Sequence, residues 1–238
     1  MSVIKAKKKG YAETEESGQF FRSTMIDTDS RLRAARGSGK TEKEASIAVF
    51  RKLKERGHPD GPPPTISDGW GGIREAMVEV YGKVPEYSGC GRRPTKKRPQ
   101  PDWKYLQMIK ERDDKGNLLG IRLKPIYGEL EELVELLGKS TAYVERTHLT
   151  MRTFSSRLSR KSIAFSKEIW IHNGCAVIED MYYNLIRPHK TLRRKNKDGG
   201  VRKWIQRTPA MAAGLTDHRW TLKELFTTVV VGEQHSAG

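Results

Sequence analysis

The alternation of apolar and polar positions near the start of the chain predicts a β-hairpin. Residues 19–27 place four bulky apolar side chains in a short run that ends at acidic turn residues, which is typical of a strand. Residues 28–30 predict a turn, and residues 31–35 follow as the returning antiparallel strand. Glycines at positions 37 and 39 then interrupt the strand pattern.

A helix is expected after these glycines. Thr41, followed three residues later by Glu44, has the form of a capping box. Apolar residues then recur at three-to-four-residue spacing and predict one buried helix face: Ala45, Ala48, Val49 and Leu53. The Pro- and Gly-rich residues 57–64 end this helix. Residues 64–68 predict a short strand that leads through a glycine turn into a helix over 73–81.

The rest of the chain predicts a long basic loop, a second hairpin and three more helices. The hairpin signal is the turn sequence Asp-Asp-Lys-Gly at 113–116, which separates two segments with strand character. The expected elements are a loop over 82–102, strands over 103–112 and 117–127, helices over 129–137, 141–160 and 166–185, and a basic loop before a small segment over 208–226.

The composition excludes several classes of protein. The 238 residues fit one substantial domain, or one domain with appendages, and 36% hydrophobic residues argue against a disordered chain. The longest apolar stretches, such as 226–231, are far shorter than the roughly 20 residues of a membrane-spanning helix. The basic N-terminus leads into polar residues, unlike a signal peptide. Two cysteines without metal-binding spacing fit free thiols in a reducing cytoplasm.

The charge balance predicts a polyanionic partner. The chain has 45 Lys and Arg against 29 Asp and Glu, a net charge of +16, and nucleic acid is the leading candidate. Much of the surplus lies in residues 139–207, which hold 16 Lys and Arg against 5 Asp and Glu. A second basic cluster spans residues 92–98.

Three carboxylates occupy positions that suit a divalent-metal site. Asp27 ends the first predicted strand, Asp68 ends the short strand before the glycine turn, and Glu145 lies in a strongly basic helix. Mg²⁺ prefers oxygen ligands, and two such ions can activate a nucleophile and stabilise the leaving oxygen in phosphoryl transfer. Each residue alone also has an ordinary role, as a turn former or as a partner for arginine, so the joint pattern carries the hypothesis.

The order of motifs resembles the catalytic domain of DDE-class insertion-sequence transposases, which are related to retroviral integrase cores. The resemblance covers residues 20 to about 225. The matching stretches are MIDTDSRL (25–32), ISDGW (66–70), YVERTHLTMR (143–152), RLxRK (157–161), FSK (165–167), YYNxxRPH (182–189) and TPAMAAGLT (208–216).

This resemblance implies a ribonuclease-H-like α/β fold, with a mixed five-stranded sheet of order 3-2-1-4-5 flanked by helices. It also implies that Asp27, Asp68 and Glu145 form the DDE triad and bind Mg²⁺, or Mn²⁺, for cleavage and joining of DNA strands. Asp29 is a near alternative to Asp27. Glutamates between 129 and 135 would shorten the spacing to the third carboxylate, but they lack the arginine-rich context of Glu145.

The implied partner is double-stranded DNA, as transposon ends and target, bound by a homo-oligomer in the prokaryotic cytoplasm at the nucleoid. For His148 and His189, a role in helix packing or capping has at least as much support as direct contact with DNA. The candidate DNA-binding residues are Arg92, Arg93, Lys96, Lys97, Arg98, Arg146, His148, Arg152, Arg157, Arg160, Lys161, Lys167, Arg187, His189 and Lys190.

Two departures from the family pattern shape the expected domain plan. Asp68 and Glu145 are separated by 76 residues, more than in integrase cores, so residues 83–127 are interpreted as an insertion. Residues 1–18 are expected to be a flexible arm, too short for the usual end-recognition domain, so a separate protein is a candidate for that role. The catalytic core is expected over 19–190, and a basic loop and C-terminal segment over 191–238.

Two other functions stay open at this point. One is a non-catalytic DNA-binding remnant of a transposase, which would keep the fold and the charge without cleaving DNA. The other is a nuclease with the same ribonuclease-H-like fold. The presence of all three carboxylates favours the active transposase, because random decay would not reliably spare them.

Overall fold

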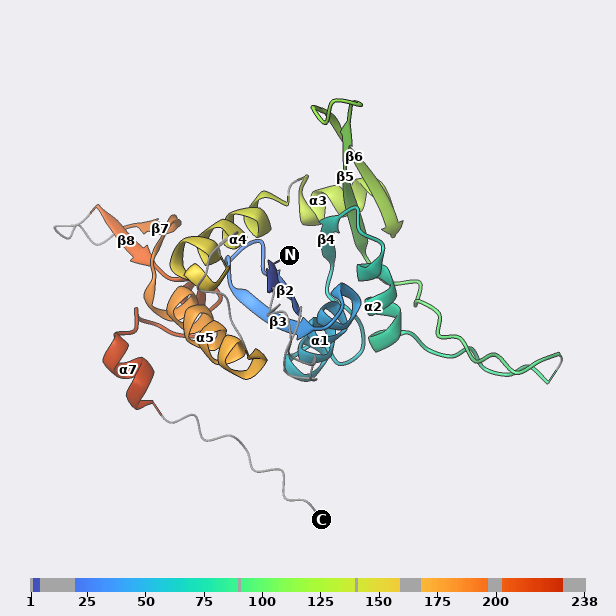
Figure 1. Ribbon diagram of the computed structural model, residues 1–238, viewed down its shortest axis with the longest axis horizontal. Helices are drawn as coiled ribbons and strands as arrows, with labels where there is room; N and C mark the ends of the chain where they lie inside the picture. The colour runs from blue at the N-terminus through green and yellow to red at the C-terminus, as the bar shows by residue number, and fades with distance from the viewer. Residues whose placement is uncertain are drawn as a thin grey trace, which may run out of the picture. The chain divides into compact units, whose positions relative to one another are not determined.

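The computed structural model describes residues 2–4, 20–89, 91–139, 141–158, 168–196 and 203–228 (Figure 1). The chain forms two compact units: unit 1 is Met1–Thr28 with Arg33–Asn173, and unit 2 is Asp29–Leu32 with Gly174–Gly238. The fold is α/β, as expected, but the expected division after residue 190 differs from this boundary, which falls within a helix.

The elements follow the predicted order over most of the chain. Unit 1 contains β1 (Ser2–Ile4), β2 (Phe20–Ile26), β3 (Arg33–Gly39), α1 (Glu42–Arg56), β4 (Thr65–Asp68), α2 (Gly72–Tyr81), β5 (Tyr105–Arg112), β6 (Leu118–Tyr127), α3 (Leu130–Leu137), α4 (Ala142–Phe154) and the 3₁₀ turn η1 (Ser156–Leu158). The helix α5 (Ile169–Met181) crosses into unit 2, which contains the π-helical turn η2 (Tyr182–Ile186), β7 (His189–Lys195), β8 (Trp204–Arg207), α6 (Pro209–Ala212) and α7 (Leu222–Thr227).

The described strands form three small sheets, with orders β1-β2-β3, β4-β5-β6 and β7-β8. The single five-stranded sheet of order 3-2-1-4-5 is not among them. The short strand β4 pairs with β5 in parallel, while β2 pairs with β1 and β3. In unit 1 the two sheets are joined by a common hydrophobic core, to which β3, α1, α2 and β5 all contribute.

The hairpin β2–β3 is longer than predicted, because its glycines belong to the strand. Gly37 pairs with Ser23, and Gly39 pairs with Phe21. An added Cβ at Gly37 would lie 2.1 Å from the carbonyl oxygen of Ala45 in α1. The glycines therefore let α1 approach this face of the hairpin closely, which sequence punctuation alone does not reveal.

A short part of the expected N-terminal arm is described, and it is a strand. Ser2–Ile4 form β1, which pairs antiparallel with β2. The interval 5–19 lies outside the described residues.

One half of the capping box predicted at the start of α1 is present, because the Thr41 side chain caps the helix while the Glu44 carboxylate binds the N–H of Lys40 and not that of Thr41. The Thr41 Oγ1 accepts a hydrogen bond from the Glu44 N–H (3.1 Å), and the Lys40 N–H donates to the Glu44 carboxylate (2.8 Å). The helix then buries Val49, Phe50 and its other apolar residues against the core. These two local features explain why residues 42–56 form a helix with one apolar face.

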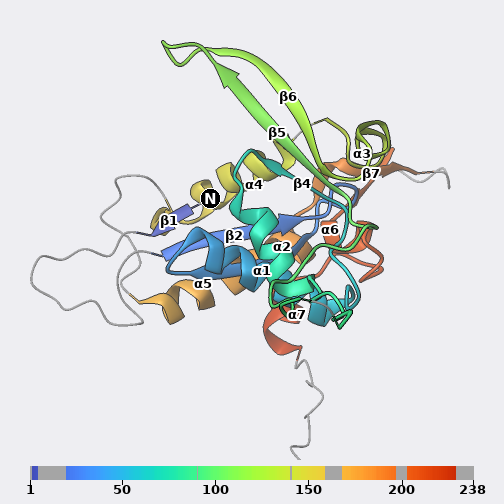
Figure 2. The ribbon, with the colours of Figure 1, turned by 90° about the vertical axis from the view of Figure 1, so that its right-hand side faces the viewer.

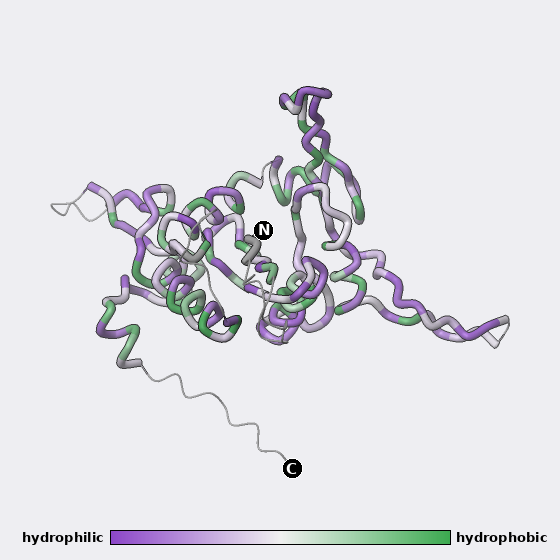
Figure 3. Tube along the Cα trace, viewed as in Figure 1, coloured by the Kyte–Doolittle hydropathy of each residue, from purple (hydrophilic) through white to green (hydrophobic). Residues whose placement is uncertain are grey.

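The predicted second hairpin is confirmed as β5–β6, which extends well beyond the elements at its base (Figure 2). The preceding loop also extends away from α2 and is mostly hydrophilic (Figure 3). Backbone hydrogen bonds join Lys83 and Arg98 at its base. Both projections fall within the segment interpreted as an insertion.

Helix α4 ends at Phe154 and not near residue 160. Ser155 leaves helical geometry (φ −126°, ψ 107°), although its N–H still donates to the Met151 carbonyl (2.9 Å). Serine side chains compete for backbone hydrogen bonds, and this favours the end of a helix at Ser155 and Ser156.

No helix among the described residues has the length and apolar character needed to cross a membrane. Cys175 is a free, exposed thiol, while Cys90 lies outside the described residues.

Candidate active site

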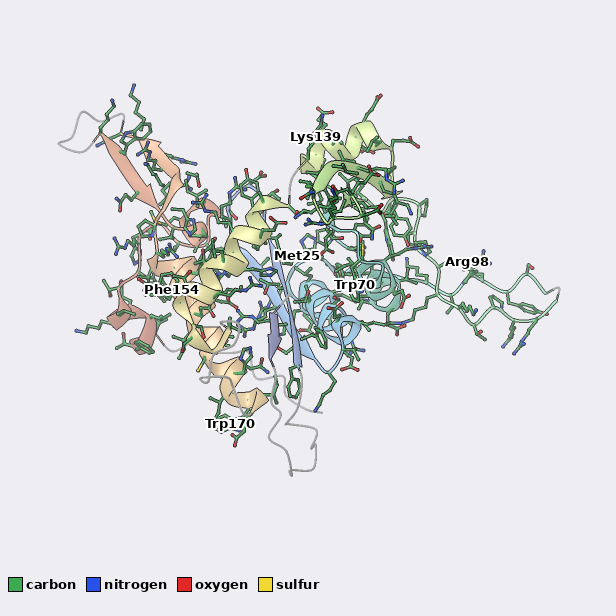
Figure 4. The ribbon with its side chains drawn as sticks, turned by 45° about the horizontal axis from the view of Figure 1, so that its top comes forward. Met25, Trp70, Arg98, Lys139, Phe154 and Trp170 are labelled. Atoms are coloured by element: carbon green, nitrogen blue, oxygen red, sulfur yellow. The ribbon has the colours of Figure 1, made fainter. Side chains whose placement is uncertain are left out.

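The three predicted carboxylates all lie in unit 1, and all are exposed. Asp27 directly follows β2, Asp68 is the last residue of β4, and Glu145 lies in the first turn of α4. Figure 4 labels Met25 on β2, two residues before Asp27, and Trp70 just after β4, two residues after Asp68.

Asp68 and Glu145 lie beside the same stretch of β5. Asp68 is the register partner of Met108, and Lys110 follows two residues later on the same face of the strand. The Lys110 ammonium forms an ion pair with Glu145 Oε1. The structure therefore brings the second and third predicted carboxylates to one strand, although 76 residues separate them in sequence.

A buried hydrogen-bond network supports the end of β4. The Ser67 hydroxyl and the Tyr105 hydroxyl lie 2.8 Å apart, and Gln107 Nε2 donates to the Tyr105 oxygen (2.9 Å) and to the Trp70 carbonyl (3.2 Å). Burial raises the pKa of Tyr105, and the charge of Asp68 adds to that increase. The network fixes the backbone on both sides of Asp68, while the carboxylate itself stays exposed.

Helix α4 also reaches the strand that leads to Asp27. Arg22 on β2 and Arg33 on β3 are buried, with 2% and 6% of their surfaces exposed. Their positive charges act on His148, one turn after Glu145 in α4. The helix bearing Glu145 therefore contacts both sheets of unit 1: β5 through Lys110 and β2 through the neighbourhood of Arg22.

His148 is partly buried and uncharged at neutral pH. Burial is the main cause that lowers its pKa to about 3, and Arg152, Arg22 and Arg33 lower it further. A neutral imidazole offers no charge to a DNA phosphate. This geometry matches the packing role that the sequence left open for His148.

Carboxylate oxygens are suitable ligands for Mg²⁺, but the side chains of Asp27, Asp68 and Glu145 do not form one cluster. Asp68 and Glu145 supply the hard oxygen ligands that this ion prefers, next to exposed surface where water can complete its coordination. In the part of the chain that the structure describes, no three His, Cys, Asp or Glu side chains lie close enough together to hold a metal ion.

The predicted DNA-binding residues of the long loop are exposed, and two of them have partners. Arg93 lies over the ring of Tyr87, 5.4 Å from its centroid, and Lys97 forms an ion pair with Glu79 at 3.2 Å. The other three loop candidates, which are also exposed, are Arg92, Lys96 and Arg98. Figure 4 labels Arg98 in this loop.

The candidate DNA-binding residues on and after helix α4 differ in their exposure and in whether the structure describes them. On α4, Arg146 is exposed and Arg152 is partly buried. Arg157 lies in η1, while Arg160, Lys161 and Lys167 lie outside the described residues.

The candidates in unit 2 flank the start of β7. The His189 ring packs edge-on against Tyr183, with 4.7 Å between ring centroids. The Arg187 N–H donates to the Tyr182 carbonyl (2.9 Å), and the neighbouring Lys190 is exposed. The role of these three residues in DNA binding stays a prediction.

Sequence reasoning missed two features near these candidates. The sequence gives no signal that Lys110 contacts Glu145, because this contact depends on the register of β5. The expected basic loop after residue 190 is instead the paired strands β7 and β8. The dense run of cations in residues 190–195 marks this segment in the sequence. It contains one apolar residue, which is too few to show the alternation that predicts a strand.

Comparisons with known proteins add no family to this picture. The chain matches no protein-family model, no curated protein and no solved structure.

Proposed function

We propose that this chain is the catalytic domain of a DDE-class DNA transposase with a ribonuclease-H-like core. The observation that carries the proposal is the placement of Asp68 and Glu145 beside the same stretch of β5, through the register of β4 and the Lys110 ion pair. The ordered motifs of the sequence and the net charge of +16 support it.

Asp27, Asp68 and Glu145 would hold the divalent ions in this mechanism. Bound Mg²⁺ would supply activation of the attacking oxygen and stabilisation of the leaving oxygen. The network behind Asp68 would keep its carboxylate in place. Lys110 would neutralise Glu145 until the ligands assemble, and it would then be free to face a phosphate oxygen of the DNA.

The reaction would be hydrolysis of one phosphodiester bond, followed by attack of the released 3′-hydroxyl on a target phosphodiester. Double-stranded DNA would be the substrate, and a homo-oligomer would bring two element ends together. A separate protein is a candidate for recognition of the ends.

The experiment is a nicking and strand-transfer assay on a plasmid that carries the DNA flanking this protein's own gene. We expect products that require Mg²⁺ or Mn²⁺. The variants Asp68→Asn and Glu145→Gln should lower the rate by about 100-fold or more, the scale of losing an electrostatic group at a reacting centre. Asp60→Asn and Glu55→Gln, at exposed carboxylates outside the predicted triad and outside β5, are the matched controls.

Full activity in Asp68→Asn would exclude the proposed mechanism. A wild-type protein that binds DNA but yields no product with either metal would instead favour the non-catalytic remnant. Cleavage without strand transfer would favour the nuclease.

A further inference from the structure

The hairpin β7–β8 is a cationic ribbon that the candidate active site does not use. We propose that this ribbon inserts into the major groove of double-stranded DNA. The inference rests on the proposed function, since it names a DNA-holding element for the same substrate, and it assigns that role to unit 2.

The described residues of the ribbon concentrate positive charge. The residues described from 189 to 196 and from 203 to 207 include no Asp or Glu. Apart from the partly buried Arg207, the cations are exposed. The six are Lys190, Arg193, Arg194, Lys195, Lys203 and Arg207.

Both faces of the ribbon carry these cations. Lys195 is the register partner of Trp204, and Arg194 is the partner of Ile205, so the two pairs project from opposite faces. A flat anionic surface would engage one face only. A DNA groove places a phosphate backbone on each side of an inserted element, which matches a ribbon that is cationic on both faces.

The aromatic residue of the ribbon orients one of its arginines. The Arg193 guanidinium lies over the Trp204 ring, 4.2 Å from its centroid. This stacking restricts the side chain before any partner binds, which lowers the entropy lost on phosphate contact. Trp204 and Ile205 stay 37% and 46% exposed, and their apolar surfaces could contact base edges such as the thymine methyl group.

Three cations of the other long hairpin, β5–β6, have partners within the protein. On β5–β6, Arg122 forms an ion pair with Glu111 at 3.0 Å, and Lys110 pairs with Glu145. The Arg112 guanidinium donates to the Gly116 carbonyl (2.7 Å). These three cations of β5–β6 already have partners within unit 1. A hairpin that projects from the protein therefore need not carry uncompensated positive charge, and the charge of β7–β8 calls for another explanation.

The dimensions of the ribbon also fit the groove. Two hydrogen-bonded strands lie about 5 Å apart, and the major groove of B-DNA, about 12 Å wide, admits a two-stranded ribbon with its side chains. The minor groove, about 6 Å wide, is too narrow for both strands.

The test measures binding of the full chain to a fluorescein-labelled DNA duplex by fluorescence anisotropy, in EDTA, over about 50 to 200 mM salt. The double variant Arg193→Ala/Lys195→Ala should bind more weakly, and the slope of log affinity against log salt should fall by about 2. The control Lys43→Ala/Arg122→Ala removes the same charge from exposed residues that are paired with carboxylates, and its slope should stay near the wild-type value.

Variants at Trp204 distinguish the effect of orienting Arg193 from the effect of its charge. Trp204→Ala should weaken duplex binding, and Trp204→Phe, which keeps a ring under the guanidinium, should restore most of it. Circular dichroism and thermal unfolding would establish that each variant is folded.

Wild-type affinity and salt slope in Arg193→Ala/Lys195→Ala would overturn the inference, as would an equal loss in the control. A loss confined to single-stranded DNA or RNA would also overturn it. Because binding in EDTA requires no catalysis, an inactive protein whose duplex binding depends on the ribbon would refute only the proposed function. An active transposase whose binding is independent of the ribbon would refute only this inference.

Discussion

At the scale of single residues, His148 shows how charge is distributed behind the candidate site. It is partly buried, and its ring lies in the field of buried arginines on β2 and β3. The folded protein therefore keeps this imidazole neutral at pH values where a solvated histidine would bind a proton.

This shift predicts acid sensitivity of the fold. Between the ordinary pKa near 6.5 and the folded value of about 3, the unfolded chain binds a proton that the folded chain does not, so stability falls as the pH falls through this range. At pH 5 the loss is about 2 kcal/mol. His148→Gln should reduce the difference in unfolding free energy between pH 7.5 and pH 5, as measured by urea denaturation.

His218 provides a control of opposite sign. Hydrogen bonds to Asp217 and then to Glu224 raise its pKa, so its stabilising effect is present at low pH and is lost as the pH rises through that raised pKa. His218→Gln should not reduce the acid sensitivity. An unchanged pH dependence in His148→Gln would show that His148 takes up its proton without unfolding.

At the scale of elements, the close approach of β3 and α1 determines how the first hairpin packs against this helix. Gly37 and Gly39 face the first turns of α1, and a Cβ at Gly39 would lie 2.8 Å from the Ala45 nitrogen. Ala35 continues the same face into the hydrophobic core. The small side chains of this strand therefore set the distance between sheet and helix.

This packing predicts a large effect of a single methyl group. Gly37→Ala should destabilise the protein by about 3 kcal/mol, because the new Cβ meets the backbone of α1, which cannot move aside as a side chain can. Gly120→Ala, at a strand glycine of β6 with open space around it, should stay within about 1 kcal/mol of the wild type. Urea denaturation of both variants tests this, and equal stabilities would mean that α1 shifts freely.

The elements that the sequence predicted well have strong local signals. The first hairpin, the capped helix α1, the strand β4 and the Asp-Asp-Lys-Gly hairpin are confirmed. The errors lie where tertiary contacts override local preference. Gly37 reads as a break but is a packing requirement, and residues 189–195 form a strand because β8 pairs with them.

The three carboxylates of the candidate site could be proposed from the sequence, but the residues that contact and support them could not. Asp27, Asp68 and Glu145 follow from motif order, and the structure locates each at the end of a strand or the start of a helix, as expected. Their function stays a prediction. Lys110 could not be found from sequence, because only the parallel register of β4 and β5 brings it near Glu145.

At the scale of the whole molecule, the excess of positive charge is divided between the two units. Unit 1 carries the basic loop 92–98 and the arginines of α4, while unit 2 carries β7–β8. Each unit therefore carries exposed cations of its own.

This distribution predicts strongly salt-dependent binding to any duplex DNA, whatever its sequence. More than six exposed cations are available, and six or more phosphate contacts correspond to a loss of about 1,000-fold in affinity between 50 and 200 mM salt. Anisotropy titrations of the wild-type protein in EDTA would measure this loss. An affinity that changes less than tenfold over the same range would rule out binding dominated by phosphate contacts.

The ion pair between Lys110 and Glu145 has a further consequence for the order of assembly. The negative charge of Glu145 has a partner within the protein itself, so the fold needs no divalent ion to balance it. Under the proposed function, folding and metal loading would therefore be separable events. The protein would fold before it meets Mg²⁺, and the ion would be required for strand cleavage alone.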